Sequence, residues 1–498
     1  MKKLIVVLTF VIAFAVELFS QGMNNTWLLG NDPGWPNIGR MIFDNNSYQL
    51  LSEQRKMAFK GTQATISDNQ GNFLMSSNGV WIANATNDTM MNGSGLNPGY
   101  FVNSWSDGLI IDNGNLFIPF PGDTNKYVLF HQTRLDQNSY LGGIYKTLIN
   151  ISLDSGLGAV IDKNDTLILD QLTWGITACK HGNGRDWWII AQKDSSDSLY
   201  RILFTPNGLD SIVPISIGYA PFAAGNSNQI IFSSDGSKIA QTNYDNPITR
   251  NSSIIIADFD RCTGAFSNTQ TIQLTSGNYL WGLAFSPSGD YVYACNSGFI
   301  FQINSNTLTV DTVATYDGFI SGFPPSCCAT TFYNMYLAAN GKIYITSGSS
   351  VQHLHEMNFP DSAGFSCDVQ QHIISLGNYF HLRAVPNHPN YYLGALAGSP
   401  CDSLTGINQL TEFDFNFSVS PNPNSGEFNI MYLLPQNEKG KLEIFDINGR
   451  KVFDLALPEW STMQTIILPT TIASGIYNCS ITSANERVHM KIVMINEN

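Results

Sequence analysis

The sequence predicts an all-β protein that consists of a β-propeller followed by a small immunoglobulin-like β-sandwich. Two observations predict this fold. A unit of short apolar strands around an Asn, Asp or Gly turn recurs along most of the chain, and the last part of the chain changes to strictly alternating apolar and polar residues. No helical periodicity of useful length competes with these patterns.

The repeated unit is clearest at residues 283–295, which read LAFSPSGDYVYAC, and it returns at residues 230–240, 336–345 and 64–74. Its turn residues are spaced by 54, 59, 52, 53, 52 and 49 positions, and they are Gly71, Asn125, Gly184, Gly236, Gly289, Gly341 and Asn390. A period near fifty residues with three or four strands per unit is typical of propeller blades. The anchors predict seven blades, with six and eight as alternatives because Asn125 and Asn390 fit the pattern less well.

A propeller has to close, because an open ring leaves a strand edge that can pair with other chains. We expect residues 22–60 to supply the outer strand of the last blade.

The predicted domains are a signal peptide at 1–20, the propeller at 22–402, a linker at 403–411 and a C-terminal domain at 412–498. The signal peptide is inferred from Lys2 and Lys3 followed by an apolar run at 4–16 that is too short to span a bilayer. No later stretch is long and apolar enough for a transmembrane segment, so none is predicted.

The composition restricts the partners. The formal charge of −14, from 25 Lys and Arg against 39 Asp and Glu, argues against nucleic acid, which requires a basic surface. Export permits disulfides among the eight cysteines. Cys327 and Cys328 are adjacent and are expected not to bridge each other, and one of them is expected to pair with Cys367 or Cys401, a choice that spacing alone leaves open.

Three short motifs mark the C-terminal domain. Residues 420–426 read SPNPNSG, residues 442–452 read LEIFDINGRKV, and residues 474–477 read SGIY. Together, in this order, they resemble the type A C-terminal sorting domain of proteins exported by the type IX secretion system of certain Gram-negative bacteria. The positions that carry the resemblance are Pro421, Asn422, Pro423, Gly426, Asp446, Gly449, Gly475 and Tyr477.

This resemblance implies a secreted or outer-membrane surface protein that travels through the periplasm, with the type IX translocon as a partner. In that family the domain is recognised by the translocon and cleaved off. The preceding region is also similar to secreted propeller proteins of the same bacteria, on the residues at 64–72, 91–96, 367–372, 389–394 and 399–402. That likeness consists of turns and core strands, and it lends no catalytic residue.

The sequence contains no strong catalytic, phosphate-binding or calcium-binding motif, so no catalytic residue and no cofactor is predicted. His353 and His355 lie two apart in an expected strand, which would place both rings on one face beside Glu356. A transition-metal site there is the minor interpretation because a third ligand is missing, and a polar outer strand is the major one. No metal site is predicted.

Propeller ligands bind where the loops before the innermost strands meet over the central channel. The candidate ligand-binding residues at such positions are Trp105, Asp107, Trp174, Trp281, His381 and Arg383. Tryptophan rings there would stack on sugar rings, with the polar residues as anchors. The competing interpretation is that each tryptophan packs between blades.

The sequence therefore predicts a secreted or cell-surface binding or adhesion module, whose partner is a glycan or a surface protein. Two other function classes remain open: an extracellular polysaccharide hydrolase or lyase with its site at the propeller mouth, and a purely structural surface protein. Paired carboxylates at the mouth would favour the enzyme.

Overall fold

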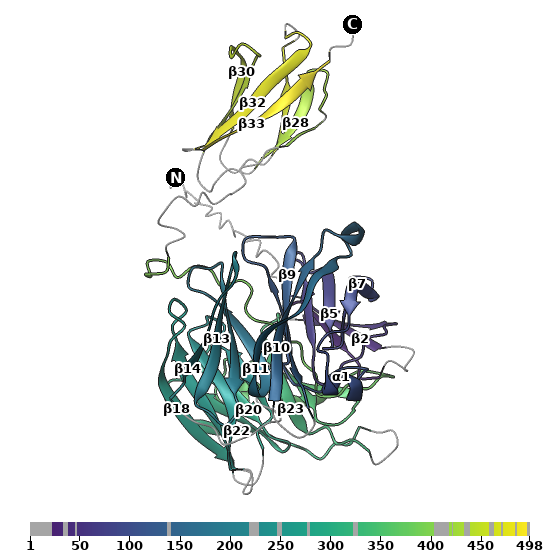
Figure 1. Ribbon diagram of the computed structural model, residues 1–498, viewed down its shortest axis with the longest axis vertical. Helices are drawn as coiled ribbons and strands as arrows, with labels where there is room; N and C mark the ends of the chain where they lie inside the picture. The colour runs from purple at the N-terminus through teal and green to yellow at the C-terminus, as the bar shows by residue number, and fades with distance from the viewer. Residues whose placement is uncertain are drawn as a thin grey trace, which may run out of the picture. The chain divides into compact units, whose positions relative to one another are not determined.

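The computed structural model describes residues 22–32, 38–44, 47–136, 141–218, 229–246, 251–275, 279–321, 327–402, 418–420, 422–432, 439–457, 463–469, 472–483 and 486–495. The chain forms two compact units, Met1–Asp402 and Ser403–Asn498 (Figure 1). The predicted signal peptide at 1–20 and the predicted linker at 403–411 lie outside the described residues.

The first unit is built from antiparallel groups of three or four strands that follow one another in chain order (Figure 1). The long β11 belongs to two groups, because its first half pairs with β10 and its second half with β12. The groups are β1 (Thr26–Leu29), β2 (Ile38–Asp44) and β3 (Ser47–Glu53); β4 (Ala64–Ser67), β5 (Phe73–Ser77), β6 (Trp81–Ala83) and β7 (Thr89–Ser94); β8 (Asn115–Pro119), β9 (Lys126–Arg134), β10 (Leu141–Asn150) and β11 (Ala159–Lys180); β12 (Trp187–Lys193), β13 (Ser198–Thr205) and β14 (Gly208–Ser216); β15 (Ile230–Phe232), β16 (Lys238–Asn246), β17 (Asn251–Phe259) and β18 (Phe266–Thr275); β19 (Gly282–Phe285), β20 (Tyr291–Cys295), β21 (Phe299–Asn304) and β22 (Val310–Thr315); and β23 (Phe332–Leu337), β24 (Ile343–Ser347), β25 (His353–Met357) and β26 (Val369–Ser375). Three single turns of helix accompany them: α1 (Tyr100–Ser104), η1 (Asp154–Gly156) and η2 (Gly364–Cys367).

The innermost strands line up around the unit. From the second group on, the strand nearest the centre contacts the corresponding strand of the next group, in the order β4, β8, β11, β15, β19 and β23, and β1 contacts β4. This arrangement is the propeller-type, all-β fold that the sequence predicts. The number of blades stays a prediction, since the first group has three strands and β11 is shared.

The repeat anchors mark real turns in most cases. Five of them are glycines with positive φ, from +73° at Gly236 to +87° at Gly71, and this conformation is one that side-chain-bearing residues rarely adopt. Asn125 also lies in the turn between two paired strands, β8 and β9. Asn390 also opens a turn, in which its side chain accepts from the Tyr392 amide, but the strand expected after it is replaced by this turn.

The N-terminal strands complete the ring differently from the prediction. Residues 22–60 supply a whole sheet, β1–β3, instead of one outer strand. On one side its Trp27 packs with Tyr344 of β24, and on the other side its Leu28 packs with Phe73 of β5. The sheet therefore lies between the last group and the second group of strands.

A segment from the far end of the unit fills the position inside β1. We call residues 381–393 the inner segment. Its Ala384 packs with Leu28, and its Val385 packs with Trp27. Its His388 exchanges hydrogen bonds with Tyr336 of β23, and the His388 ring bonds the carbonyl oxygen of Thr65 in β4 at 2.8 Å.

The inner segment also runs from one end of the innermost strands to the other. Arg383 donates to the carbonyl oxygen of Ile110, which precedes β8. Farther along, Asn387 donates to Asn113 and to Ile176 in β11, and Asn390 donates to Ser234, which follows β15. One segment thus supplies hydrogen-bond partners to four of the strand groups.

Buried glutamines join neighbouring groups. The Gln132 amide donates to the Thr173 carbonyl oxygen at 2.6 Å and accepts from the Gly175 amide at 2.9 Å. Gln229 likewise accepts from Leu283 of β19 and donates to Met335 of β23. Buried backbone groups at blade junctions need such partners because water cannot reach them.

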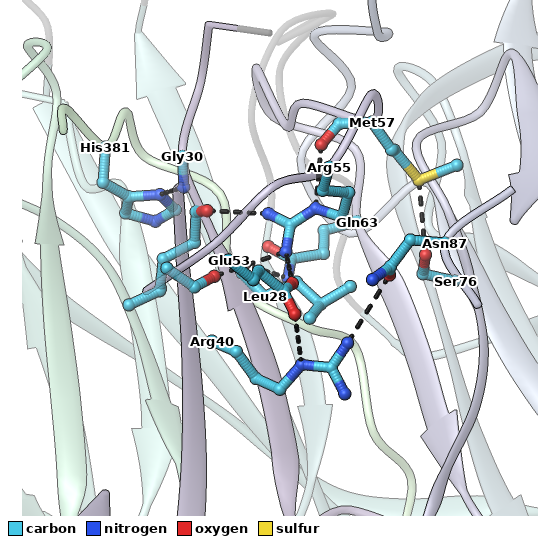
Figure 2. A network of polar contacts seen from close by, with 12 residues as sticks. Leu28, Gly30, Arg40, Glu53, Arg55, Met57, Gln63, Ser76, Asn87 and His381 are labelled. Carbon is cyan, nitrogen blue, oxygen red and sulfur yellow. Dashed lines mark hydrogen bonds and ion pairs between the residues drawn. The ribbon is translucent and has the colours of Figure 1, made fainter. Parts of the chain in front are cut away.

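A buried arginine ties the β1–β3 sheet together. The Arg55 side chain is fully buried, and its guanidinium donates to the carbonyl oxygens of Met57, Gly39 and Leu29 and to the Glu53 carboxylate (Figure 2). Glu53 also accepts from Arg40 at 2.9 Å. Burial lowers the pKa of Arg55 to about 10, so the guanidinium remains charged at neutral pH.

The cysteine pairing differs from the expectation. Cys262 bridges Cys401, and the adjacent Cys327 and Cys328 bridge each other. Cys367 is a free, buried thiol packed in the core around Phe332. The Cys262–Cys401 bridge ties the chain just after the inner segment to the turn between β17 and β18.

The second unit is a sandwich of two antiparallel sheets. One sheet contains β27 (Ser418–Ser420), β28 (Glu427–Met431) and β31 (Met463–Ile467), and the other contains β29 (Gly440–Phe445), β30 (Lys451–Leu457), β32 (Gly475–Ser483) and β33 (Glu486–Met494). The alternating apolar residues of the two sheets face inward: Phe428, Ile430 and Tyr432 share a buried core with Tyr477, Cys479 and Ile481. Within the residues that the structure describes, no helix is long and apolar enough to cross a membrane.

We expect the Arg55→Met variant to lose about 3 kcal/mol of unfolding free energy, because it leaves three buried carbonyl oxygens without donors. Urea denaturation followed by tryptophan fluorescence measures this, since eight of the nine tryptophans precede residue 403. The neighbouring Lys56 is a matched control. Its ion pair with Asp88 is exposed, so Lys56→Met should change stability by less than about 0.5 kcal/mol. Equal effects of the two substitutions would contradict the structural role of Arg55.

Candidate functional site

The best-formed cluster of predicted site residues surrounds Trp281, which directly precedes β19. Its ring stacks on Tyr333, the second residue of β23, with ring centroids 4.9 Å apart and planes 18° apart. Tyr279 contacts the same indole at 5.8 Å. Trp281 and Tyr279 are half-buried, so part of this aromatic surface is accessible to a ligand.

Arg383 also contacts Tyr333, with its guanidinium carbon 5.6 Å from the centre of the ring. Its guanidinium donates to the Tyr333 hydroxyl at 3.1 Å and to the carbonyl oxygens of Ile110 and Lys60. The buried Asp112 carboxylate lies 3.5 Å from Arg383 and accepts from Asn334 at 3.2 Å. Burial opposes the charge on Arg383, but the nearby Asp112 carboxylate and Tyr333 raise its pKa overall.

Lys60 extends this group outward. Its ammonium lies 3.3 Å from the Asp107 carboxylate, and both side chains reach solvent. We call the connected residues the mouth cluster; they are Lys60, Asp107, Asp112, Tyr279, Trp281, Tyr333, Asn334 and Arg383. The structure therefore brings together three of the predicted site residues: Asp107, Trp281 and Arg383.

Two other predicted residues are unsuited to contact a ligand. Trp174 is buried with 7% of its surface exposed, packs edge-on against Phe101 at 6.3 Å, and lies beneath the Arg134 guanidinium. His381 is 1% exposed, accepts a hydrogen bond from the Gly30 amide and donates to the Ala384 carbonyl oxygen (Figure 2). Both residues are packing elements, because they lie between sheets and not at the surface.

Trp105 is placed differently again. It follows α1, its side chain is 36% exposed, and its amide donates to Phe101. No ring contact or side-chain hydrogen bond joins it to the mouth cluster among the described residues. It offers a separate aromatic surface.

Sequence reasoning missed Tyr333, Asp112, Asn334 and Lys60. Tyr333 could have been found, because it lies at the start of an innermost strand, as the predicted residue Trp281 does. Asp112 had no such signal: it lies in an Asp-Asn-Gly turn whose composition is explained by turn chemistry alone. Its partner Arg383 is 271 positions away, so no local pattern connects them.

The mouth cluster combines an aromatic surface with paired charges. The aromatic stack offers a flat apolar surface, and polar groups surround it. Each of its two carboxylates is paired with a cation, Asp107 with Lys60 and Asp112 with Arg383. Among the described residues, no group of three His, Cys, Asp or Glu side chains could hold a metal ion.

The histidine pair in β25 does not form the site considered from the sequence. Glu356 points to the other face of the strand, where it bonds Lys342 and Tyr344. His355 is buried, and its Nδ1 accepts from the His372 amide. Burial, reinforced by nearby His372, lowers the pKa of His355 to about 4.

The sorting motif has a clear structural role in the second unit. The Asn422 side chain accepts from the Val493 amide at 2.8 Å and donates to the Lys491 carbonyl oxygen at 3.0 Å. The Asn424 backbone pairs with Val493 and Ile495. Pro421 lies outside the described residues, and Pro423 stands between the two asparagines, so the motif covers the free edge of β33.

The remaining motif residues form turns and packing contacts. Gly426 and Gly449 adopt φ of +103° and +77°. Asp446 closes the β29–β30 turn by accepting from the amides of Asn448 and Arg450. Tyr477 donates to the Ala473 carbonyl oxygen at 2.7 Å, and Gly475 lies beside its ring.

The comparison with known families identifies this second unit. Residues 418–496 match the model of the secretion system C-terminal sorting domain. This domain directs export by the type IX secretion system, and the protein is therefore a secreted or cell-surface protein. No curated protein matches the chain.

Solved structures resemble the chain only loosely. A functionally unknown protein from Desulfotomaculum acetoxidans is 13% identical, with a TM-score of 0.37, over 73% of this chain and 99% of its own. A hypothetical selenium-binding protein from Sulfolobus tokodaii is 7% identical, with a TM-score of 0.41, over 72% of this chain and 92% of its own. The extracellular domain of a putative hybrid two-component system from B. thetaiotaomicron is 10% identical, with a TM-score of 0.36, over 95% of this chain and 56% of its own. At these TM-scores the likenesses say nothing about function.

The buried His381 predicts a pH dependence of stability. Burial lowers its pKa from an ordinary 6.5 to about 4. Between these values the unfolded chain binds a proton that the folded chain does not, so unfolding free energy falls as the pH drops through this window, by up to about 1.4 kcal/mol per pH unit. Above pH 6.5 this contribution is constant.

We expect His381→Gln to be less stable than the native chain at pH 7, because it loses one of two buried hydrogen bonds, and to show a shallower fall in stability between pH 6.5 and 4. Urea titrations at pH 7, 6 and 5 measure both quantities. Parallel stability curves for the two proteins would show that His381 does not titrate as its burial requires.

Proposed function

We propose that this exported protein is a binding module that attaches to a glycan through its mouth cluster. The observation that carries the proposal is the half-buried Trp281, stacked on Tyr333 and flanked by Tyr279. A sugar ring has an apolar C–H face, and a rigid aromatic surface binds it at little cost in conformational entropy.

Polar groups around the stack would orient such a ligand. Lys60 and Asp107 form an exposed pair at the edge of the mouth cluster, so both can exchange their mutual contact for sugar hydroxyls. Arg383 is held by Tyr333, Asp112 and two carbonyl oxygens, so it fixes the stack in place more than it meets the ligand.

The cellular part of the proposal follows from the sorting domain. We infer that a signal peptide at 1–20 takes the chain to the periplasm, and that the type IX translocon recognises the C-terminal unit. A cell-surface glycan-binding module would then serve in adhesion. The matched family supports export, and the mouth cluster supports binding.

We expect Trp281→Ala to weaken binding to the recognised glycan at least tenfold while the thermal unfolding midpoint stays near that of the native chain, because the indole is half-buried at the edge of the fold. A glycan array identifies the ligand, and calorimetric titration compares the variants. Phe365→Ala is the matched control, because this aromatic ring is 80% exposed in η2 and outside the mouth cluster.

Unchanged glycan binding by a folded Trp281→Ala protein would overturn the proposal, as would equal losses for Phe365→Ala. Trp174→Ala checks that burial, and not the residue type, determines the effect of a tryptophan substitution on stability. Since Trp174 is buried, this substitution should lower unfolding free energy by about 3 to 5 kcal/mol.

Export is tested separately from binding. A chain that ends at residue 411 should accumulate in the periplasm of the native host, whereas the full chain should reach the surface or the medium. Asn422→Ala should reduce export in part, because it removes both side-chain bonds to β33. Cell fractionation with immunoblotting measures these outcomes, and normal surface display of the shortened chain would contradict the role of the second unit.

A further inference from the structure

A cavity of about 300 Å³ lies inside the first unit, away from the mouth cluster. Its walls come from the ends of β11, β15, β19 and β23 and from the turns that follow β15, β19 and β23. The mouth cluster instead gathers residues that precede or open innermost strands, so the two sites lie at opposite ends of these strands. His388, Asn390 and Leu393 of the inner segment form the remaining wall.

The cavity wall carries no Asp, Glu, Lys or Arg side chain. Its titratable groups are neutral at pH 7: burial lowers the pKa of His388 to about 4 and raises that of the Cys179 thiol to about 12. Arg261 lies behind Cys179, and its Nε and Nη2 groups donate to the carbonyl oxygens of Lys180, His181 and Gly394. A charged ligand would thus lose its water without gaining an ionic partner, which is costly.

The lining residues include both polar and apolar types. Phe232 and Phe285 are aromatic, and Ser234, Thr177 and Asn24 carry hydroxyl or amide groups. The Oδ1 atom of Asn24 is buried and accepts no hydrogen bond from the part of the chain that the structure describes. A volume of 300 Å³ is at the lower end of the range for small-molecule sites, so the space suits one small ligand.

We propose that this cavity is a second binding site, which takes a single neutral sugar residue. A neutral sugar combines hydroxyl groups with apolar C–H faces, and this combination matches a wall of hydroxyls, amides and phenyl rings without charge. The proposal is independent of the mouth cluster, since no residue is common to the two sites.

The test uses calorimetric titration of the mature chain with methyl glycosides of glucose, galactose, mannose and N-acetylglucosamine, and with glucuronate and glucosamine as charged counterparts. We expect one neutral glycoside to bind with a dissociation constant below about 10 mM, and its charged counterpart to bind at least tenfold more weakly. Ala339 is exposed at the cavity edge, so Ala339→Trp should fill the cavity and reduce binding at least tenfold, whereas Ala339→Ser should not.

Ser234→Phe is a second blocking variant, should Ala339→Trp fail to fold. Phe365→Ala lies outside both sites and should leave this binding unchanged. Loss of binding in Ala339→Trp assigns it to this cavity, and loss in Trp281→Ala assigns it to the mouth cluster, which separates failure here from failure of the mouth proposal. The inference is overturned if no neutral glycoside binds, if charged and neutral sugars bind equally, or if Trp281→Ala abolishes binding while the folded blocking variants retain it.

Discussion

The first unit depends on one constraint: the ring of innermost strands must close where the two ends of its chain meet. Between β4 and β23 the inner position is occupied by residues 384–388, which contact both strands through His388. The inner segment, residues 381–393, contains Pro386 and Pro389, which lack amide donors. It therefore closes the ring with side chains, and not with a regular backbone ladder.

Several independent interactions hold this closure. Arg55 binds the β1–β3 sheet from inside, His381 links the inner segment to Gly30, and Cys262–Cys401 fixes the chain beyond it. The disulfide closes a loop with a sequence separation of 139 residues, and cross-links over loops this long stabilise by roughly 4 to 5 kcal/mol in the chain-entropy model. Both proposed sites inherit their geometry from the closure, because Arg383 and His388 are five residues apart in the same segment.

The sequence was sufficient to predict the all-β fold and most of its turns, and insufficient to predict the closure. Strand pairs and their turns are local, so alternation and positive-φ residues such as Gly236 and Gly289 reveal them. Closure joins Gly30 to His381 and Thr65 to His388, over separations of 351 and 323 residues. Local sequence patterns do not predict such distant contacts. The prolines of the inner segment also disfavour a strand, so a search for strand patterns does not detect it.

The same reasoning explains why the predicted site residues lie in different surroundings. Position relative to the innermost strands could be inferred from the turns, and it selected Trp281, Asp107 and Arg383, which the structure brings together. Their role in ligand binding stays a prediction. The solvent exposure of each tryptophan side chain could not be predicted from the sequence. A buried tryptophan between two sheets and an exposed one at the end of a strand have equivalent positions along the chain. Trp174 and Trp281 differ in what packs over them, Phe101 and Arg134 for the first and Tyr333 on one face for the second.

The second unit has a core of its own, built from residues such as Phe428, Ile444 and Tyr477. Among the described residues, each hydrophobic core cluster draws its members from one unit. Each unit can therefore bury its apolar surface with its own residues. For this reason the proposed binding and the export can be tested by separate substitutions, since Trp281 belongs to the first unit and Asn422 stabilises the edge of β33 in the second.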